Sequence, residues 1–563
     1  MVTDVRWVAA TAVGLVLATA CGAATYYVCS SDGSDSAAGT RPAAAWRSLA
    51  KLNATRFIPG DTILLQSGST WTGQLWPKGS GAPGRPIVID VYGGTVKPAI
   101  HGGGLYDEAV TLRNQSYWEL NNLEVTNTGT TRGLRAGIRV WSVDSGTVRR
   151  VVIRGMYVHD VNGPLGTEGK QSGGIAIVAG GTTIPSNFDS VLIENCLVHR
   201  TDRTGIWTSS VWRNRGGQTA GPGAWFPSTN VIIRGNVVDS AGGDGIVVRV
   251  CREPRIEGNL VKHAASLAKE WVAGIWPFNC DDALFQYNEA CSTHTTMDGQ
   301  GFDADWMCRR TVFQYNYSHD NEGGFMLVCC EGASSGNFND SAVIRFNVSV
   351  NDGAKVFKIA GTPTNALVHN NTVYTRHGSS GTLVNVEAWN GMAGRTSFVN
   401  NIFMMEGSYA LNAPGTNAHF SHNLWYGIAA PSDSHAITAH PQLTLPGNAP
   451  MGRENLQGYR ITRSSPALGS ALQVDGGVVR DFWGNDRGAA SVQDRGAHQL
   501  GWETSTGSQR PPREQRREQQ PGAPAGRKSQ AQQRSGVMHL LNGRMCSRVG
   551  LATGNHALAV ARP

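Results

Sequence analysis

The chain has 563 residues, a formal net charge of +7 at pH 7, 70 glycines and only 16% charged residues. Residues 501–563 carry the whole charge excess, because the body of the chain before them is neutral. A neutral body excludes a basic nucleic-acid-binding surface as the main function. The glycine-rich composition is typical of a turn-rich β protein and excludes a coiled coil or a wholly disordered chain.

The first 24 residues have the pattern of a secretion signal. Arg6 precedes an apolar stretch, which ends in small residues through Ala24. We therefore expect a secreted, extracellular protein. Cys21 follows Ala18-Thr19-Ala20, which leaves lipoprotein anchoring at Cys21 as a minor alternative. No later apolar run is long enough to span a bilayer, so no other association with a membrane is expected.

Residues 25–104 are predicted to form an N-terminal cap and the first coils of a repeat array. Tyr26-Tyr27-Val28 and Gly60–Leu65 have the composition of strands. Between them, Trp46–Leu52 has the apolar spacing of a short amphipathic helix. Because a repeat array needs its open end covered, we expect this helix to cap it.

A phrase of about ten residues then recurs through residues 105–439, and asparagine is its most constant letter. Steps of roughly 22 to 31 residues mark a solenoid. Each copy holds a short β-rich run, so we predict an all-β fold, a single-stranded right-handed parallel β-helix. The asparagines are expected at bends with left-handed backbone angles, with their amides hydrogen-bonded from coil to coil. They are Asn236, Asn259, Asn288, Asn316, Asn347, Asn371, Asn401 and Asn423, preceded in the same slot by Asn122, Met156 and Cys196.

Two further stretches are distinguished by composition. The longer repeats before Asn236 must carry loops, which would form the walls of a groove. Residues 440–500 are predicted to close the body. Residues 501–563 are predicted to be a disordered tail or a sequence artefact, since Arg510–Gly536 is rich in Gln, Arg and Pro and has no apolar period.

Cysteines recur at one place in successive copies, at Cys251, Cys280, Cys308 and the pair Cys329/Cys330. Adjacent coils lie about 4.8 Å apart, which is within the Cα range of a disulfide. The pattern permits disulfides such as Cys251–Cys280 and Cys308–Cys330, or a stack of buried free thiols. No Cys-x-x-Cys pair or histidine partner accompanies these cysteines, so no zinc site is predicted among them.

Aligning the copies on their Gly-Ile phrase predicts two columns of outward side chains, because alternate residues of a strand point to opposite faces. The first column is Arg139, Ala176, Trp207, Val247, Trp276, Asp303, Met326, Lys358 and Asn385. The second column is Trp141, Val178, Ser209, Arg249, Phe278, Asp305, Val328, Ala360 and Glu387.

The columns predict a polysaccharide-binding groove around Asp303 and Asp305, which lie two residues apart. Lys358 lies two coils away on one side and Arg249 two coils away on the other. Aromatic rings stack on pyranose faces, and the charged groups can transfer protons. Turns before the strands add Asp244, Asp298, His319 and Glu322. The predicted catalytic residues are Asp303, Asp305, Lys358, Arg249, Glu322 and His319, and the predicted substrate-binding residues are Trp207, Trp276, Arg139, Asn385 and Glu387. The structural alternative is that the aspartates bind turns and the outward tryptophans pack under loops.

The layout resembles the pectate-lyase-like superfamily of right-handed β-helices over about residues 25–500. Gly301-Phe302-Asp303-Ala304-Asp305 is similar to a stretch of alginate epimerases and lyases, in which Asp303 falls on the catalytic aspartate and Asp305 replaces a histidine. Asp305-Trp306-Met307 resembles the nucleophile segment of β-helix β-xylosidases, whose acid/base glutamate would fall near Leu327 or Val328. The resemblance implies a bacterial, secreted, carbohydrate-active enzyme.

Three functions are compatible with these residues. The main prediction is a monomeric polysaccharide lyase acting by β-elimination on a uronate-containing glycan. Lys358 or Arg249 would be the base, and Ca²⁺ held by Asp298, Asp303 and Asp305 would be the only cofactor. The alternative is a glycoside hydrolase that uses Asp303 with Asp305, or Asp305 with Glu322, as its carboxylate pair. A second alternative is a non-catalytic polysaccharide-binding β-helix, because a fold does not dictate an activity.

Overall fold

The computed structural model describes residues 22–500, except 269, 334–335, 475–477, 479 and 488–491. The chain divides into two compact units, Met1–Trp502 and Glu503–Pro563, and all described residues belong to the first. Most of the predicted secretion signal and all of the predicted tail therefore fall outside the described residues. Within the described part of the chain, no helix combines the length and apolar character needed to cross a bilayer.

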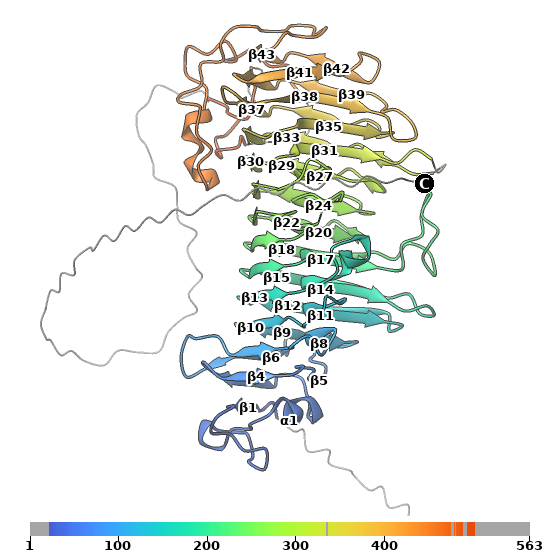
Figure 1. Cartoon of the computed structure of the whole chain (residues 1–563), viewed down its shortest axis with the longest axis vertical. Coiled ribbons are helices and arrows are strands. Elements are labelled where there is room, and N and C mark those ends of the chain that lie inside the picture. The colour runs from blue at the N-terminus through green and yellow to red at the C-terminus, as the bar shows by residue number, and fades with distance from the viewer. Residues whose placement is uncertain are drawn as a thin grey trace, which may run out of the picture. The chain divides into compact units, whose positions relative to one another are not determined.

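Each coil adds strands to three long sheets in which every pairing is parallel (Figure 1). We number these sheets 1 to 3. Sheet 1 runs β1 (Thr25–Val28), β3 (Thr62–Gln66), β6 (Ile87–Tyr92), β9 (Trp118–Asn121), β12 (Thr147–Arg154), β15 (Asn187–Glu194), β18 (Ser228–Arg234), β22 (Arg255–Glu257), β25 (Leu284–Gln286), β29 (Val312–Gln314), β33 (Val343–Arg345), β36 (Leu367–His369), β39 (Thr396–Val399) and β42 (Ala418–Ser421), with β21 (Cys251–Arg252) beside β18.

Sheet 2 runs β4 (Thr70–Thr72), β7 (Ala99–His101), β10 (Glu124–Asn127), β13 (Tyr157–Val161), β16 (Leu197–Thr201), β19 (Val237–Ala241), β23 (Leu260–Lys262), β26 (Glu289–Cys291), β30 (Tyr317–His319), β34 (Val348–Val350), β37 (Thr372–Thr375), β40 (Ile402–Met405) and β43 (Leu424–Tyr426). Sheet 3 runs β8 (Glu108–Arg113), β11 (Ala136–Val143), β14 (Gly173–Gly180), β17 (Thr204–Ser210), β20 (Ile246–Arg249), β24 (Ile275–Phe278), β27 (Gln300–Ala304), β31 (Gly324–Cys330), β35 (Lys355–Gly361), β38 (Ser380–Glu387) and β41 (Ser408–Asn412).

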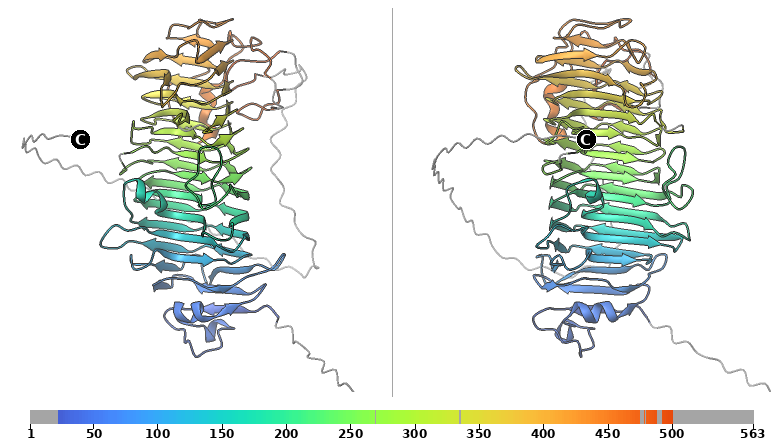
Figure 2. Two further views of the ribbon diagram at one scale, coloured as in Figure 1. Left: turned by 90° about the vertical axis from the view of Figure 1, so that its right-hand side faces the viewer. Right: turned by 45° about the vertical axis from the view of Figure 1, so that its right-hand side comes forward.

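The remaining elements are short. Two small parallel pairs are β2 (Arg56–Phe57) with β5 (Lys78–Gly79), and β28 (Cys308–Arg309) with β32 (Asn339–Asp340). Three 3₁₀ helices are η1 (Pro42–Ala44), η2 (Thr167–Gln171) and η3 (Arg453–Tyr459). The one α-helix of the described residues, α1 (Leu49–Ala54), lies beside β1 at the N-terminal end of the coils, as seen from further sides in Figure 2.

The predicted fold class, a right-handed parallel β-helix, is confirmed. One continuous apolar core runs inside the coils from Val28 to Trp425. α1 begins three residues later than the sequence predicts, because Ser48 caps it by accepting a hydrogen bond from the Lys51 N–H. Leu49 and Leu52 of α1 are buried in the same core, so the helix packs on the first coils.

The asparagine ladder is present. Each side-chain amide from Asn236 to Asn401 donates to the Oδ1 of the next ladder asparagine at 2.9–3.0 Å, and all are buried. The left-handed backbone angle belongs to the preceding residue instead, for example Gly235, Tyr287 and Asn400. In the first copy the register therefore places Leu123 in the ladder slot, and Asn122 takes the left-handed position.

We expect Asn316→Ala to lower the free energy of unfolding by about 2–4 kcal/mol, because buried groups left without a hydrogen-bond partner cost about 1–3 kcal/mol each. Asn316 accepts from the Asn288 backbone and side chain, and it donates to the Phe285 carbonyl. Denaturant unfolding measures the change. Asn448→Ala, at an exposed position, is the matched control and should stay within about 0.5 kcal/mol. Equal stability of the two variants would contradict a stabilising ladder.

The disulfides that the cysteine spacing permits are not formed among the described residues. All eight cysteines within the described residues are free thiols. Cys251, Cys280 and Cys308 stack inside the coils, where the Cys280 N–H donates to Cys308 Sγ at 3.4 Å. Cys308 pairs in register with Asn339 and Cys330 pairs with Gly361, so the expected neighbours Cys308 and Cys330 are not in register. Burial raises the pKa of the Cys280 and Cys308 thiols well above their usual value, which favours the buried-thiol alternative.

The outward columns need one correction. In β31, Met326 pairs with Phe302 and Leu327 pairs with Asp303, because Gly324 aligns with Gln300 one residue earlier than expected. Met326 and Val328 consequently point into the core, and Leu327 and Cys329 point outward in their place. The register returns to the predicted one at Lys358, which pairs with Leu327 and Asn385.

Candidate functional site

A cavity of about 470 Å³ opens on the outer face of sheet 3, and we call it the sheet 3 cavity. Its floor comes from five successive strands, β24 to β38, and the residues that follow them. Its walls come from η2, from residues 271–273 and from residues 388–389. It is lined by Lys170, Trp271, Val272, Ala273, Trp276, Asp298, Asp303, Asp305, Trp306, Leu327, Cys329, Lys358, Ala360, Glu387, Ala388 and Trp389.

Asp303 and Asp305 lie together on the floor. Asp303 is in β27 and Asp305 follows that strand directly, so both side chains leave the same face of the sheet. They are 6% and 9% exposed. Cys329 Sγ, from the next coil, lies 3.1 Å from Asp305 Oδ1, and one oxygen of each carboxyl lies within 4.8 Å of the other. The Trp306 N–H donates to Asp305 Oδ1 at 2.8 Å.

The two carboxyls titrate differently. Burial and the neighbouring carboxylates of Asp305 and Asp298 raise the pKa of Asp303 well above its usual value, which favours its neutral form. Burial also raises the pKa of Asp305, but hydrogen bonds from Cys329 and the Trp306 N–H hold it at about 6. Two nearby carboxyls with separated pKa values can serve different roles in proton transfer.

Lys358 lies between two carboxylates of the cavity. Its Nζ is 2.8 Å from Asp298 Oδ1 and 3.1 Å from Glu387 Oε1. Burial by itself would lower the pKa of Lys358, but the two carboxylates outweigh burial and raise it. A lysine with a raised pKa does not accept a proton near neutral pH, so Lys358 is suited to binding and not to acting as a base.

Indole rings line both the floor and the walls of the cavity. Trp306 and Trp389 meet edge to face, with ring centroids 6.1 Å apart. Trp276 donates from Nε1 to Asp244 Oδ1 at 3.0 Å, which orients its ring. Trp271 is largely exposed at the mouth. Aromatic faces beside polar groups are suited to stacking on sugar rings.

Buried ion pairs hold the walls in place. Arg139 binds Glu108 at 2.9 Å and donates to the carbonyl of Gln171, which anchors η2. Arg203 is fully buried and pairs with Glu270, next to Trp271. Lys170 Nζ donates to the Trp271 carbonyl at 3.3 Å, so the two wall segments are also tied to each other.

Arg249 lies beside the sheet 3 cavity. It lines an adjoining hollow of about 250 Å³ together with Lys170, Trp276 and Asp305. Its guanidinium is 5.1 Å from the Trp276 ring centroid. Burial lowers the pKa of Arg249, and the carboxylates of Asp244 and Asp305 oppose that effect. The predicted neighbourhood of Arg249 and Asp305 is thus present.

Three of the predicted substrate-binding residues do not face the cavity. Trp207 is 1% exposed and packs with Ala176, Val178 and Val247 under the wall segments. Arg139 is used in the Glu108 ion pair. Asn385 is buried and donates to Glu387 Oε2 at 2.7 Å. Trp207 therefore packs beneath other residues, as the structural alternative expects for outward tryptophans, whereas Arg139 and Asn385 bind neighbouring carboxylates.

His319 and Glu322 are not near Asp303. His319 belongs to β30 of sheet 2, is 3% exposed and contacts Glu289 and Asp320. Burial would lower the pKa of His319, but hydrogen bonds to Asp320, Cys291 and Glu289 raise it to about 11. The Glu322 side chain is 55% exposed beside His294, outside the residues that line the cavity. His319 is the last residue of β30 and Glu322 follows that strand, and neither lines the sheet 3 cavity.

Several cavity residues escaped the sequence pattern. Trp306 and Trp389 follow outward acidic residues and lie just beyond the strands that were aligned. Lys170 and Trp271 come from loops, where no periodicity exists to place them. Cys329 was hidden by the one-residue register error in β31. Only Trp306, directly after Asp305, and Trp389, two residues after Glu387, had a usable signal.

The donor set of Asp298, Asp303 and Asp305 does not fit the expected Ca²⁺. Calcium takes six to eight oxygen ligands. Here the Lys358 ammonium already binds Asp298, and the Cys329 thiol, a poor calcium ligand, lies against the other two carboxyls.

Residues 100–282 match a family model described as a right handed beta helix region, and the chain is a right-handed parallel β-helix protein. A lacto-N-biosidase from Bifidobacterium longum subsp. longum is 30% identical over an alignment of 579 positions, which covers 82% of this chain. The match covers 35% of that relative, so the chain spans about a third of its length. Two crystal structures of a GH136 lacto-N-biosidase from Eubacterium ramulus share the fold, with a TM-score of 0.53, 23% and 24% identity, and coverage of 69% of this chain and 68% of theirs.

These comparisons correct the expectation of a polysaccharide lyase. The relatives are lacto-N-biosidases, which are glycoside hydrolases, and they favour the hydrolase alternative. The site agrees with the correction for a physical reason. As the base of an elimination, Lys358 would need a depressed pKa, whereas its pKa is raised by Asp298 and Glu387.

Proposed function

We propose that the chain is a glycoside hydrolase that cleaves a glycan bound in the sheet 3 cavity. One observation carries the proposal: Asp305 is a buried carboxyl with a pKa of about 6 in a cavity that also holds the Asp298–Lys358 ion pair. A general acid works best when its pKa lies near the working pH. Glycoside hydrolysis needs such an acid together with a second, ionised carboxylate.

The three carboxyls suit different roles. Asp305 donates its proton to the glycosidic oxygen, so that the leaving sugar departs as an alcohol. Asp298, ion-paired with Lys358, is the carboxylate that acts at the anomeric carbon, directly or through water. The pKa of Asp303 is raised well above its usual value, and in its neutral form this carboxyl can donate a hydrogen bond. The Asp305/Glu322 pair is excluded because Glu322 lies outside the cavity.

The proposed substrate is an oligosaccharide that ends in lacto-N-biose, because the relatives are named lacto-N-biosidases. The walls supply indole faces for pyranose rings, and Glu387 and Lys170 supply hydrogen-bonding groups at the rim. With the sequence pattern of residues 1–24, the proposed place of action is outside the cell.

Product chemistry tests the proposed reaction. The protein is incubated with lacto-N-tetraose and, separately, with uronate-rich polysaccharides, and products are separated and weighed by mass spectrometry. Hydrolysis adds one water to the two fragments, whereas elimination leaves an unsaturated uronate. The proposal is supported if a disaccharide is released and the two fragments together are heavier than the substrate by one water. An unsaturated product, or no cleavage of any panel glycan, would overturn it.

The pH profile tests the role of Asp305. If Asp305 is the general acid, kcat/KM must fall tenfold per pH unit as pH rises above about 6, because the proton it donates is lost. If Asp303 were the acid and Asp305 the ionised partner, activity would instead rise through the same pH. The two assignments predict opposite changes of kcat/KM as the pH rises through about 6. Measuring kcat/KM between pH 4 and 9 at constant ionic strength therefore distinguishes them.

A further inference from the structure

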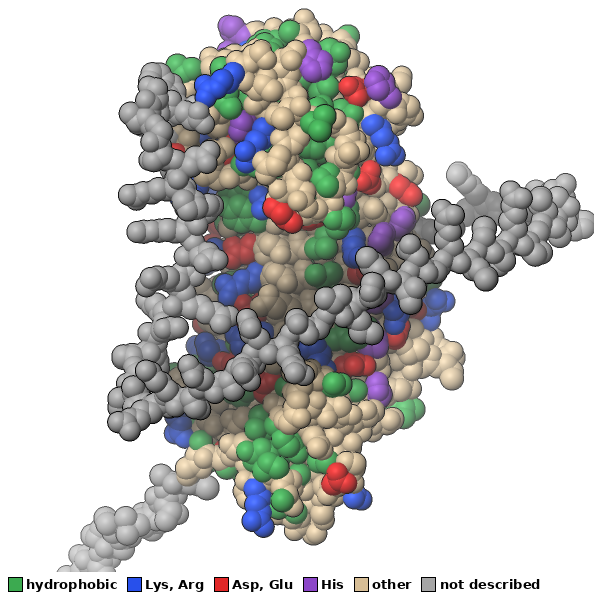
Figure 3. Space-filling model, turned by 90° about the vertical axis from the view of Figure 1, so that its left-hand side faces the viewer, with side chains coloured by type: hydrophobic (Ala, Val, Ile, Leu, Met, Phe, Trp, Pro, Cys, Tyr) green, Lys and Arg blue, Asp and Glu red, His purple; other side chains and the backbone are tan. Residues whose placement is uncertain are grey.

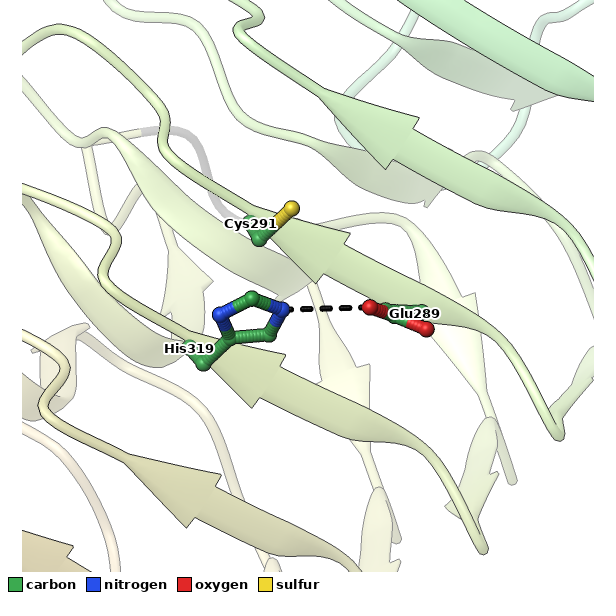
Figure 4. Close-up of side chains that lie close together, drawn as sticks. All are labelled: Glu289, Cys291 and His319. Atoms are coloured by element: carbon green, nitrogen blue, oxygen red, sulfur yellow. Dashed lines mark hydrogen bonds and ion pairs between the residues drawn. The ribbon is translucent and has the colours of Figure 1, made fainter. Parts of the chain in front are cut away.

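A second group of ligand-type side chains lies on the outer face of sheet 2, away from the sheet 3 cavity. Glu289 and Cys291 leave the same face of β26, and His319 leaves β30 in register with Cys291. Figure 4 shows the three side chains pointing toward one another from the two neighbouring strands. None has a place in the proposed hydrolysis.

The donor atoms are close enough to share one ion. A carboxylate oxygen of Glu289, Cys291 Sγ and a ring nitrogen of His319 all lie within 4.8 Å of one another. His319 Nε2 is 3.1 Å from Glu289 Oε1. Zinc binds nitrogen and oxygen at about 2.0–2.2 Å and sulfur at about 2.3 Å, so its ligand atoms lie roughly 3–4 Å from each other. Carboxylate, thiolate and imidazole are also the ligand types that zinc prefers.

The surroundings orient these donors. Asp320 Oδ2 lies 2.9 Å from His319 Nδ1 and can accept its proton in a hydrogen bond, which leaves Nε2 as the ligand atom facing Glu289. A carboxylate behind a metal-binding histidine is the usual way to fix its tautomer. The Gly452 N–H donates to both oxygens of Glu289 at 3.1 Å.

Residues 440–500, which we call the closing segment, cover the group. Met451 and Gly452, just before η3, lie over it, and Met451 Sδ is 3.9 Å from Cys291 Sγ. Glu289, Cys291 and His319 are consequently all buried. Figure 3 looks at the side where η3 lies, and there positive and negative side chains are interspersed on the surface. An ion here would join two coils to the segment that closes the body.

We propose that Glu289, Cys291 and His319 bind a zinc ion, with the Met451 thioether or a water as the fourth ligand. The ion stabilises the docking of the closing segment on sheet 2 and takes no part in glycan cleavage. The rival arrangement is a protonated His319 between Glu289 and Asp320, which would balance the charges without metal.

The test uses the full chain, stripped with a chelator and then given zinc or cobalt. We expect one zinc per chain after gel filtration, a higher midpoint of thermal unfolding, and a near-ultraviolet thiolate-to-cobalt band. Cys291→Ser and His319→Gln should abolish stoichiometric binding, and Asp320→Asn should weaken it about 10–100-fold. Cys196→Ser, at another buried thiol, and Cys329→Ser, in the sheet 3 cavity, should keep the cobalt band.

Absence of stoichiometric zinc in the wild-type chain would overturn the proposal and leave the protonated ion-pair arrangement. A cobalt band that survives in Cys291→Ser would also overturn it, and loss of the band in Cys329→Ser would place the metal in the sheet 3 cavity instead. Because the wild-type zinc content and cobalt spectrum need no variant, the proposal remains falsifiable if a substitution prevents folding.

Discussion

Replacing Asp305 by asparagine is expected to lower kcat/KM for the natural oligosaccharide by about 10²–10⁴-fold, because general acid catalysis contributes that much. Asparagine keeps the size of Asp305 and its hydrogen bonds with Cys329 and the Trp306 N–H. It lacks the carboxyl proton of Asp305, whose pKa is raised to about 6, and so cannot act as the acid. An aryl glycoside with a good leaving group should be cleaved far better by the variant than the oligosaccharide, since its departure needs little protonation.

The measurement is steady-state kinetics of Asp305→Asn on both substrates. Glu322→Gln is the matched control, because Glu322 is an exposed acid one coil away that does not line the cavity. It should keep the wild-type rate. Undiminished hydrolysis of the oligosaccharide by Asp305→Asn would remove this residue from the mechanism.

Replacing Asp298 by asparagine is expected to cause a loss of similar size on both substrates, because the carboxylate at the anomeric carbon is needed whatever the leaving group. The change also removes one of the two carboxylates that hold Lys358. If Asp298 attacks directly, azide should restore turnover and form a glycosyl azide. The anomeric configuration of the wild-type product, read by NMR, then distinguishes direct attack, with retention, from attack through water, with inversion.

The variant Asp303→Asn tests which two carboxyls form the catalytic pair. Asparagine preserves a neutral, hydrogen-bonding group, so this variant should keep much more activity than Asp298→Asn. The opposite order would assign catalysis to Asp303 with Asp305, whose carboxyl oxygens lie within 4.8 Å of each other. A similar thermal unfolding midpoint in all three variants is needed for the comparison, since each of these carboxyls is largely buried.

Much of the fold could be predicted from residue spacing alone. The recurrence of asparagine indicated stacked coils, although their lengths vary, and the neighbouring side-chain amides hydrogen-bond from coil to coil. The Asp303, Asp305 and Lys358 neighbourhood followed from counting coils, because strands of a parallel sheet keep register over several coils. Counting coils failed at β31, where the alignment was wrong by one residue. It placed Met326 on the outer face, whereas in the structure Met326 points into the core and Leu327 points outward.

The sequence by itself determined the repeat, the parallel sheets and the carboxyls of one strand, since these depend on contacts between residues at regular spacing. Only the tertiary structure decided which of the outward side chains are accessible. Loops cover Trp207, the closing segment covers His319, and Lys170 and Trp271 enter the cavity from segments without periodicity. It also decided protonation, because the pKa of Asp305 and of Lys358 depends on burial and on charges brought from other coils.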